Sequence, residues 1–344
     1  MTMLTLTPLP ARLGPTCLGP TCLGAEITGL DLTNPLPDET IVAIEAAIAE
    51  HAVLVFRDAD ITDDQQLDFS RRFGPLEETH GTGISKPGEQ RLHPAFADVS
   101  NIDTDDTILA RDSRRRLYGL GNMLWHSDSS FKPVPASYSI LSGRRVAAKG
   151  GQTEFADMRA AYDALDAATQ AEIADLICEH SLIYSREILG FTDLTPAEKV
   201  TMTPVHQPLT RRHPISGRAS LYLASHIGGI IGWPVPEARA FIRDLTEHAT
   251  DRRFVYAHQW RNFDLVMWDN RCTMHRVRRF DATEKRDMRR TTVAGAARDF
   301  SAGTARDFSA GTARDIGAGT ARDLITGTAR ENTTNTARDA STAA

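Results

Sequence analysis

The spacing of apolar and polar residues predicts helices and short strands in mixed order. Apolar side chains at helical intervals, or a capping threonine with a closing glycine, predict helices over residues 39–51, 62–74, 158–177 and 236–249. Short runs rich in β-branched and aromatic residues, separated by turn residues, predict strands over residues 52–56, 136–143, 220–225, 253–260, 264–270 and 289–295. This pattern favours a mainly β fold with flanking helices, in which helices decorate a sheet sandwich.

Both ends of the chain contain short tandem repeats. Residues 13–24 are LGPTCLGPTCLG, and from Ala297 to Ala344 an eight-residue unit, ARDFSAGT, recurs with drift. At ~100° per residue, such a repeat moves its apolar position by about 80° around a helix each time, so no apolar stripe forms. We therefore expect an N-terminal extension over residues 1–23, one domain over residues 24–296, and a disordered tail over residues 297–344.

Charge and composition argue against several classes of protein. The 344 residues are 41% hydrophobic and 24% charged, with a formal net charge of −6 at pH 7. Without a positive field, binding to nucleic acid or to an anionic membrane is not expected, and no stretch approaches the ~20 apolar residues of a membrane span. The four cysteines lie too far apart for a disulfide framework or a paired zinc site. We therefore expect a cytoplasmic protein.

The stretch LWHSDSSF, residues 124–131, places a histidine and an aspartate two positions apart. On an extended strand, side chains with this spacing point to the same side, so His126 and Asp128 can converge on one point. His275, in WDNRCTMHRVRRF, supplies a third donor after a predicted strand. Two histidines and one carboxylate on one face of an octahedral ion leave three positions open, which suits non-haem Fe(II) and oxygen chemistry. The His-x-Asp pair alone is a weak signal.

A threonine and two arginines are candidates for binding carboxylates near that metal. Thr153 follows a double glycine, and Arg286 and Arg290 lie four positions apart in a run that favours a strand. On a strand their guanidinium groups share one face, whereas Arg289 points to the other. Because guanidinium binds carboxylate in bidentate fashion, we expect a cavity that accepts two carboxylates.

Taken together, LWHSDSSF, GGQTEFADMRAAYDAL, FVYAHQW, DLVMWDNRCTMHR and RRTT resemble the TauD/TfdA family of Fe(II)/2-oxoglutarate-dependent dioxygenases. Within that family they are most similar to the 2,4-dichlorophenoxyacetate (aryloxyalkanoate) dioxygenases. The resemblance covers residues 24–295, with a departure at Gln152, where close relatives often have an acid. It implies a double-stranded β-helix, or jelly roll, with His126, Asp128 and His275 as iron ligands.

The same resemblance implies the remaining roles in the site. Thr153 and Arg286 match the residues that bind the C5-carboxylate of 2-oxoglutarate, and Arg290 matches the arginine that takes the acidic group of the substrate. Fe(II) is the implied cofactor, and 2-oxoglutarate and O₂ are the implied cosubstrates. Oxidative decarboxylation of 2-oxoglutarate gives succinate and CO₂.

A glycine-broken segment, ETHGTGISK, has two interpretations. Loops at this place cover the substrate in relatives, so His80, Ile84 and Lys86 are candidate substrate contacts, but a plain surface loop is equally consistent with the sequence.

Other conspicuous residues have structural interpretations. Trp125, Trp260 and Trp268 lie in strand-like runs and are expected in the core, because large aromatic side chains mostly supply buried surface. His226 and His258 are expected to support the structure or the ligands rather than to bind metal themselves.

Three functions fit these residues. An aryloxyalkanoate dioxygenase would hydroxylate the carbon next to the ether oxygen, and the product would collapse to a phenol and glyoxylate. The same mechanism on a sulfonate or sulfate ester is the alternative, because Arg290 would hold either anion. A non-enzymatic jelly roll that binds metal or sugar would require both arginines and Thr153 to be incidental. The expected partner is a small-molecule carboxylate, and the sequence leaves a homo-oligomer open.

Overall fold

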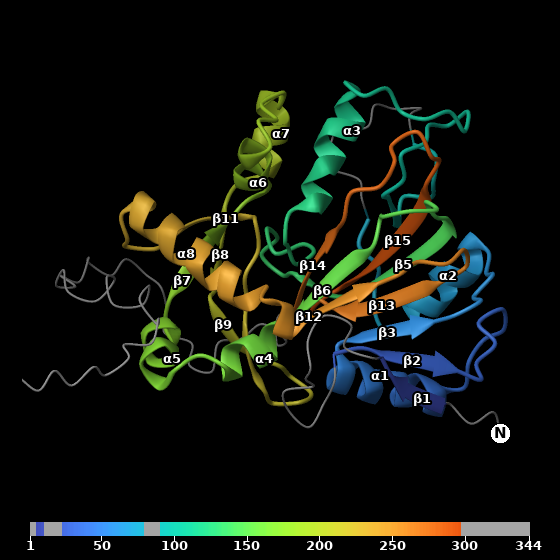
Figure 1. Cartoon of the computed structure of the whole chain (residues 1–344), viewed down its shortest axis with the longest axis horizontal. Coiled ribbons are helices and arrows are strands. Elements are labelled where there is room, and N and C mark those ends of the chain that lie inside the picture. Colours follow the sequence, from blue (N-terminus) through green and yellow to red (C-terminus); the bar gives the residue numbers. More distant parts are fainter. Residues whose placement is uncertain (1–4, 10–22, 79–89, 297–344) are drawn as a thin grey trace, which may run out of the picture. The chain divides into compact units, whose positions relative to one another are not determined.

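A seven-stranded sheet is the largest element of the structure (Figure 1). The computed structural model describes residues 5–9, 23–78 and 90–296, all of which belong to one compact unit, Met1–Arg306. The strand order is β1-β2-β3-β13-β5-β15-β4, and neighbouring strands are antiparallel except β2 and β3. Its strands are β1 Thr5–Pro8, β2 Ala25–Thr28, β3 Val53–Phe56, β4 Phe96–Asp98, β5 Ala136–Arg145, β13 Leu265–Asp269 and β15 Asp287–Ala294.

Helices flank these strands. In chain order, those of the described residues are α1 Asp38–His51, α2 Asp63–Arg71, α3 Arg114–Gly119, the 3-10 helix η1 Leu120–Met123, α4 Met158–Asp163, α5 Ala167–Ile173, α6 Leu182–Ile188, α7 Pro196–Thr201, α8 Val235–Ala249 and the 3-10 helix η2 Arg252–Phe254.

A smaller antiparallel sheet, with the order β12-β6-β14, packs against one face of the large one. Its strands are β6 Thr153–Asp157, β12 Val255–His258 and β14 Thr273–Val277. The chain alternates between the sheets, from β5 to β6 and then, after an insertion, through β12, β13, β14 and β15. Phe155 of β6 and Trp268 of β13 belong to one buried cluster, so the two sheets share a core. A mainly β sandwich with outlying helices is thereby confirmed.

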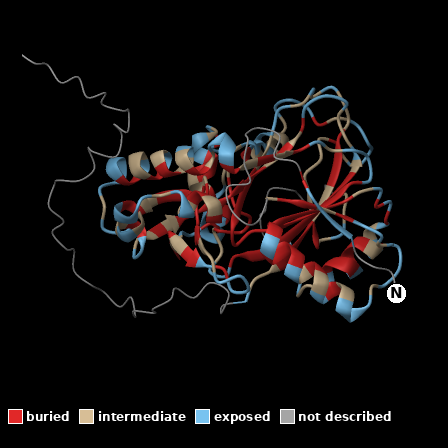
Figure 2. Cartoon of the chain, turned by 60° about the horizontal axis from the view of Figure 1, so that its bottom comes forward, coloured by how far each residue is buried: buried red, intermediate tan, exposed pale blue. Residues whose placement is uncertain are grey.

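Strand β13 shows why both faces of the large sheet are covered. All of its residues are buried, and neighbouring side chains on a strand point to opposite faces. Val266 and Trp268 enter the cluster shared with the small sheet, whereas Leu265 and Met267 enter the cluster that α1 and α2 cover. Buried residues accordingly concentrate in the strands and on the inward sides of these helices (Figure 2).

The insertion between β6 and β12 is a separate group of helices and short strands, at the left of Figure 1. It contains α4 to α8, and its apolar cluster, with Leu221, Leu223 and Leu245 among its members, extends to Ala156 and Met274 of the small sheet. Two small sheets, β11-β7-β8 and β10-β9, complete it. Their strands are β7 Ile177–His180, β8 Val205–Pro208, β9 Thr210–Arg212, β10 Ala219–Leu221 and β11 Ile227–Ile230.

Most of the predicted elements are present. Helices α1, α2 and α8 correspond to three of the predicted helices, and β3, β5, β12, β13 and β15 to five of the predicted strands. Thr62 caps α2 as expected: its side chain accepts a hydrogen bond from the backbone N–H of Gln65, and the backbone N–H of Thr62 donates to Oε1 of Gln65.

Two predictions are wrong in extent. Residues 158–177 are not one helix, because α4 ends at Asp163 and the chain starts α5 after Asp166, whose carboxylate accepts from the Thr169 backbone and caps the new helix. Of the strand predicted at residues 220–225, only the start lies in β10.

Several predictions fall outside the described residues and stay predictions. They concern most of the N-terminal extension, the segment with His80, Ile84 and Lys86, and the repeats from Ala297. Within the described ranges, no helix is both long enough and apolar enough to cross a membrane.

Candidate metal centre and adjoining cavity

His126 and His275 are neighbours through their backbones. The N–H of His126 donates to the carbonyl of His275 at 3.1 Å, and the N–H of His275 donates back at 2.8 Å, beside β14. The expectation that His126 and Asp128 share a strand is wrong, because beyond this bridge the segment turns at Asp128. The backbone N–H of Asp128 donates to the Asn270 side chain at 3.2 Å, which fixes the turn against the end of β13.

The three residues selected as metal ligands lie together and are buried. Their ligand atoms all fall within 4.8 Å of one another, and Asp128 is 3.8 Å from Nε2 of His126 and 3.7 Å from Nε2 of His275. Nδ1 of His126 lies 2.7 Å from the Leu124 carbonyl, so we assign the proton to Nδ1 and the free lone pair to Nε2. Two imidazole nitrogens and a carboxylate fit a divalent transition metal such as Fe(II).

Burial and neighbouring charges set the protonation of this cluster. Burial lowers the pKa of His126, and burial together with the nearby His126 lowers the pKa of His275 well below its ordinary value. Burial alone would raise the pKa of Asp128, but the Arg290 guanidinium holds it well below its usual range. Neutral imidazoles and an ionised carboxylate are the forms that bind metal.

His213, Asp269 and Cys272 form a second group of potential metal ligands, but the charge of the Asp269 carboxylate is already balanced by Arg271. Arg271 donates to Asp269 at 2.6 Å, and Nε2 of His213 lies 2.9 Å from the same oxygen. Burial raises the pKa of the Cys272 thiol far above its usual value, so it is not a thiolate. This network braces the turn between β13 and β14, and the His126 cluster is the better metal site.

The side chains of Arg289 and Arg290 lie on opposite faces of β15, as the alternation of side chains along a strand predicts. Arg290 donates to Asp128 at 2.6 Å, on the side of the metal cluster. Arg289 pairs with Asp63 of α2 at 2.7 Å and with Asp287 at 2.8 Å, on the other face.

Arg286 precedes β15 and is buried, with 5% of its surface exposed. It donates to the carbonyl of Gly151 at 3.4 Å, close in sequence to Thr153, and no acidic residue in the described ranges pairs with it. Burial lowers the pKa of Arg286 to about 10. Thr153 accepts a hydrogen bond from Nε1 of Trp260 at 2.9 Å. A buried cation with no counter-ion fits a carboxylate ligand.

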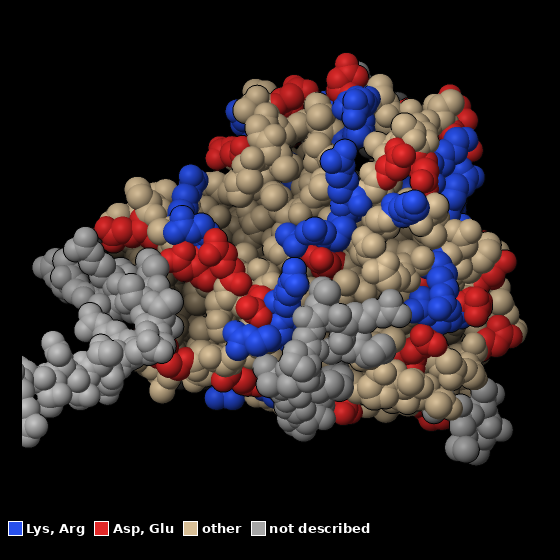
Figure 3. Space-filling model, in the orientation of Figure 1, with Lys and Arg blue, Asp and Glu red and all other residues tan. Residues whose placement is uncertain are grey.

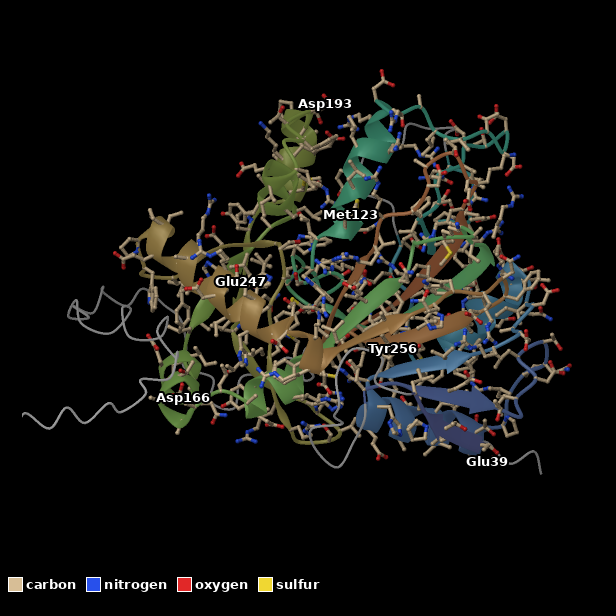
Figure 4. The ribbon with its side chains drawn as sticks, viewed as in Figure 1. Glu39, Met123, Asp166, Asp193, Glu247 and Tyr256 are labelled. Atoms are coloured by element: carbon tan, nitrogen blue, oxygen red, sulfur yellow. The ribbon has the colours of Figure 1, made fainter. Side chains whose placement is uncertain are left out.

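A cavity of about 970 Å³ adjoins the cluster, with His126, Asp128 and Arg290 in its wall. Its other walls include residues of α3, η1 and α6 and the chain after α7. Figure 3 shows the hollow between α3 and the α6–α7 pair, with Lys and Arg side chains along one rim. Arg114 of α3 pairs with Asp193 at 3.0 Å. Figure 4 labels Asp193 at the top of the view, beside the α6–α7 pair. Met123, labelled in the same view, ends η1 just before the His126 segment.

Comparison with known proteins decides the family. The model of the "Taurine catabolism dioxygenase TauD, TfdA family" matches residues 11–292. The chain belongs to the TauD/TfdA dioxygenase family. The α-ketoglutarate-dependent 2,4-dichlorophenoxyacetate dioxygenase of Cupriavidus pinatubonensis is 45% identical over 262 residues, which are 76% of this chain and 91% of that protein.

Two further relatives match this TauD/TfdA dioxygenase over most of its length. The (S)-phenoxypropionate/α-ketoglutarate-dioxygenase of Delftia acidovorans is 36% identical over 305 residues, 86% of this chain and 96% of that protein. The crystal structure of AAD-2 in complex with Mn(II) and N-oxalylglycine has a TM-score of 0.80 and 52% identity, and the match covers 86% of this chain and 99% of that one.

Some cavity residues of this TauD/TfdA dioxygenase have no sequence signal. His226, interpreted above as structural, lines the cavity, with its ring centre 6.0 Å from that of His126. Arg186 of α6 also lines it, although its sequence context, LIYSREI, is an unremarkable helical turn. Only the packing of the insertion brings these two side chains toward the metal cluster.

The other aromatic and histidine interpretations agree with the structure. Trp268 is buried in the core, and Trp125 and Trp260 are partly buried against it. His258 lies away from the residues that line the cavity, with Nε2 3.1 Å from Asp264.

Proposed function

We propose that this chain is an Fe(II)- and 2-oxoglutarate-dependent dioxygenase that hydroxylates the carbon next to the ether oxygen of an aryloxyalkanoate such as 2,4-dichlorophenoxyacetate. One observation carries the proposal: two imidazoles and a carboxylate meet beside a cavity whose wall includes His126 and Asp128, with the Arg290 guanidinium against that carboxylate. Family membership and the activities for which the two curated relatives are named support it.

His126, Asp128 and His275 would hold the iron. The reciprocal backbone hydrogen bonds keep the two histidines in place, and Ser139 donates to Asp128 at 2.7 Å, so the ligands are oriented before metal binds. When bound, Fe(II) with 2-oxoglutarate and O₂ supplies the oxidation, in which the cosubstrate becomes succinate and CO₂ and one oxygen atom enters a C–H bond.

Arg286 and Thr153 would bind the far carboxylate of 2-oxoglutarate. Arg286 is a buried cation whose side-chain hydrogen bond to the Gly151 carbonyl is long, at 3.4 Å, so a carboxylate would supply the missing negative charge. The AAD-2 structure contains N-oxalylglycine, a dicarboxylate with the same chain length as 2-oxoglutarate, which supports a cosubstrate of this kind.

Arg290 would contact the acidic group of the primary substrate. In an aryloxyacetate the reactive C–H lies between the carboxylate and the ether oxygen, so an acid held beside Asp128 brings that carbon toward the metal. Hydroxylation there gives a hemiacetal. Its bond to the ether oxygen breaks, that oxygen takes up the hydroxyl proton, and a phenol and glyoxylate leave.

A sulfonate or sulfate ester is the second candidate substrate, because a guanidinium binds either anion. The curated relatives reported above are named for aryloxy acids, and this favours the aryloxyalkanoate.

The alternation of the chain between two facing sheets supports a double-stranded β-helix, or jelly roll. We include this fold and a dioxygenase domain over residues 24–296 in the proposal, with residues 1–23 and 297–344 as extensions that it does not need.

A substrate panel tests the function. The purified full-length chain with Fe(II) and 2-oxoglutarate should release phenol and succinate in equal amounts from 2,4-dichlorophenoxyacetate, and little succinate with taurine or an alkyl sulfate. If only taurine or the alkyl sulfate were turned over, a sulfonate or sulfate ester would be the substrate instead of the aryloxyalkanoate. A charge-transfer band should form when Fe(II) and 2-oxoglutarate are added anaerobically. If neither this band nor any turnover were seen, both the aryloxyalkanoate and the sulfur-acid activities would be excluded.

A further inference from the structure

Five basic side chains line the cavity beside the metal cluster, and four of them have acidic partners. These ion pairs are Arg91 with Asp98 and Asp287, Arg115 with Asp103, Lys132 with Glu77, and Arg290 with Asp128. The fifth is Arg186 of α6, for which no Asp or Glu in the described parts of the chain forms an ion pair.

Arg186 is nevertheless held in a defined place, with only 7% of its surface exposed. The centre of its guanidinium lies 3.9 Å from the centre of the Tyr118 ring, and Nη1 donates to Ser185 at 2.9 Å. A side chain at Gly121 in η1 would overlap the guanidinium, so the glycine makes room for it. Its buried Nε has no acceptor among the described residues.

A buried guanidinium is costly unless an anion offsets its charge. Tyr118 offers a ring face and Ser185 a neutral oxygen, and neither carries negative charge. The Ser185 oxygen also lies 3.0 Å from Nδ1 of His226, whose ring centre is 6.0 Å from that of His126. The uncompensated charge therefore lies near the metal cluster, where an anionic ligand of the cavity would meet it.

We propose that Arg186 binds the carboxylate of the primary substrate and so makes the cavity selective for acids, an inference that rests on the proposed function. Arg290 is already engaged by Asp128, and Arg286 is not among the residues that line this cavity. A carboxylate has two oxygens and accepts from two guanidiniums, so Arg186 and Arg290 hold it together. The aryl ring is left to apolar parts of the wall such as Phe131 and Leu182.

The test compares the wild-type chain with Arg186→Gln and Arg186→Lys, and uses Arg116→Gln as the matched control. Arg116 lies on α3, a different helix that also contributes to the cavity wall, but it is not itself among the cavity residues, so its replacement removes the same charge away from the cavity. Binding of an aryloxyacetate and of its neutral amide is measured by anaerobic calorimetry with Fe(II) and 2-oxoglutarate present. Apparent KM values are measured for the acid and for 2-oxoglutarate.

Arg186→Gln should weaken binding of the acid by about ten- to hundredfold, the loss expected for a charged hydrogen bond. Binding of the amide and the KM for 2-oxoglutarate should stay within about twofold, Arg186→Lys should be intermediate, and Arg116→Gln should match the wild type. Unchanged acid binding, or an equal loss for acid and amide, would overturn the proposal. So would an effect on 2-oxoglutarate alone.

Gly121→Ala provides a second variant that keeps every charge. Its methyl group would displace the Arg186 guanidinium, so acid binding should weaken while amide binding does not. This variant and Arg186→Lys decide the question if Arg186→Gln does not fold, and wild-type acid affinity in both would reject Arg186 as the anchor.

The two proposals fail in different ways. Normal turnover of aryloxy acids by Arg186→Gln would remove the role of Arg186 alone. If the wild-type chain binds no aryloxy acid, the proposed substrate is wrong, and the same variants are titrated with an alkyl sulfate. Equal sulfate affinity in wild type and Arg186→Gln, or no affinity in the wild type, would overturn the role of Arg186 as well.

Discussion

His126 and His275 exchange both of their backbone hydrogen bonds, at 3.1 and 2.8 Å. The two proposed metal ligands come from distant parts of the chain, yet the main chain alone keeps them adjacent. Changing either side chain leaves these backbone bonds in place. A substitution can therefore remove metal binding without unfolding the protein.

Replacement of His126, Asp128 or His275 by alanine should therefore abolish turnover and iron binding while the fold is retained. Three protein ligands are the minimum for a site of this type, so two should not hold the metal productively. Iron content, turnover and melting temperature of each variant check this, with His206→Ala, an exposed histidine of β8, as the control. Substantial turnover by any of the three at saturating iron would contradict the assignment.

Arg286 and Arg290 should each affect the binding of a different ligand. Arg286→Gln should raise the KM for 2-oxoglutarate, and Arg290→Gln the KM for the aryloxy acid, each by about ten- to hundredfold because a charged hydrogen bond is lost. Steady-state kinetics in both substrates check this. Equal effects of both changes would point to a shared structural role, and an unchanged KM for the acid in Arg290→Gln would leave Arg186 or Lys86 as the anchor.

Asp157→Asn should destabilise the fold by about 3–5 kcal/mol, because it leaves the buried Arg159 without its charge partner. Arg159 donates to Asp157 at 3.0 and 3.1 Å and to the Ala49 carbonyl at 2.8 Å. Urea unfolding at pH 7 measures the effect. Asp163→Asn is the control, because its ion pair with Arg218 is largely exposed and should contribute less than about 1 kcal/mol.

The same ion pair predicts a dependence of stability on pH. Burial would raise the pKa of Asp157, but Arg159 lowers it below the ordinary 3.8. The stabilisation is therefore present above pH 3.8 and is lost as the pH falls through the lower pKa of the folded state. The free energy of unfolding of the wild type should fall more steeply in this acid range than that of Asp157→Asn. If the two plots of unfolding free energy against pH were parallel, the Asp157 carboxylate would contribute nothing to this pH dependence.

A chain that ends at Ala296 should keep its melting temperature within about 2 °C and its turnover unchanged. The cut preserves β15, and the repeats beyond it offer too little apolar surface to bury. Calorimetry and the substrate assay check this. A clear loss in either would mean that the repeats contribute to the domain.

Local signals predicted some elements well and others poorly. The Thr62–Gln65 capping box marks the start of α2 because both of its hydrogen bonds form within one turn. Residues 158–177 have helical periodicity throughout, but the Asp166 cap divides them into α4 and α5, and the chain then pairs as β7 with β8 and β11. That pairing depends on strands far away in sequence, which periodicity does not detect.

The sequence by itself determined the chemistry of the metal cluster and the sides taken by Arg289 and Arg290. Residue type decides which donor atoms are available, and strand alternation decides which face each side chain occupies. The tertiary structure alone decided that Asp128 reaches the cluster from a turn, and that Arg186 and His226 line the cavity. These positions follow from how the insertion packs in an apolar cluster that it shares with β6 and β14, and that packing sums many contacts between distant residues that no local pattern contains.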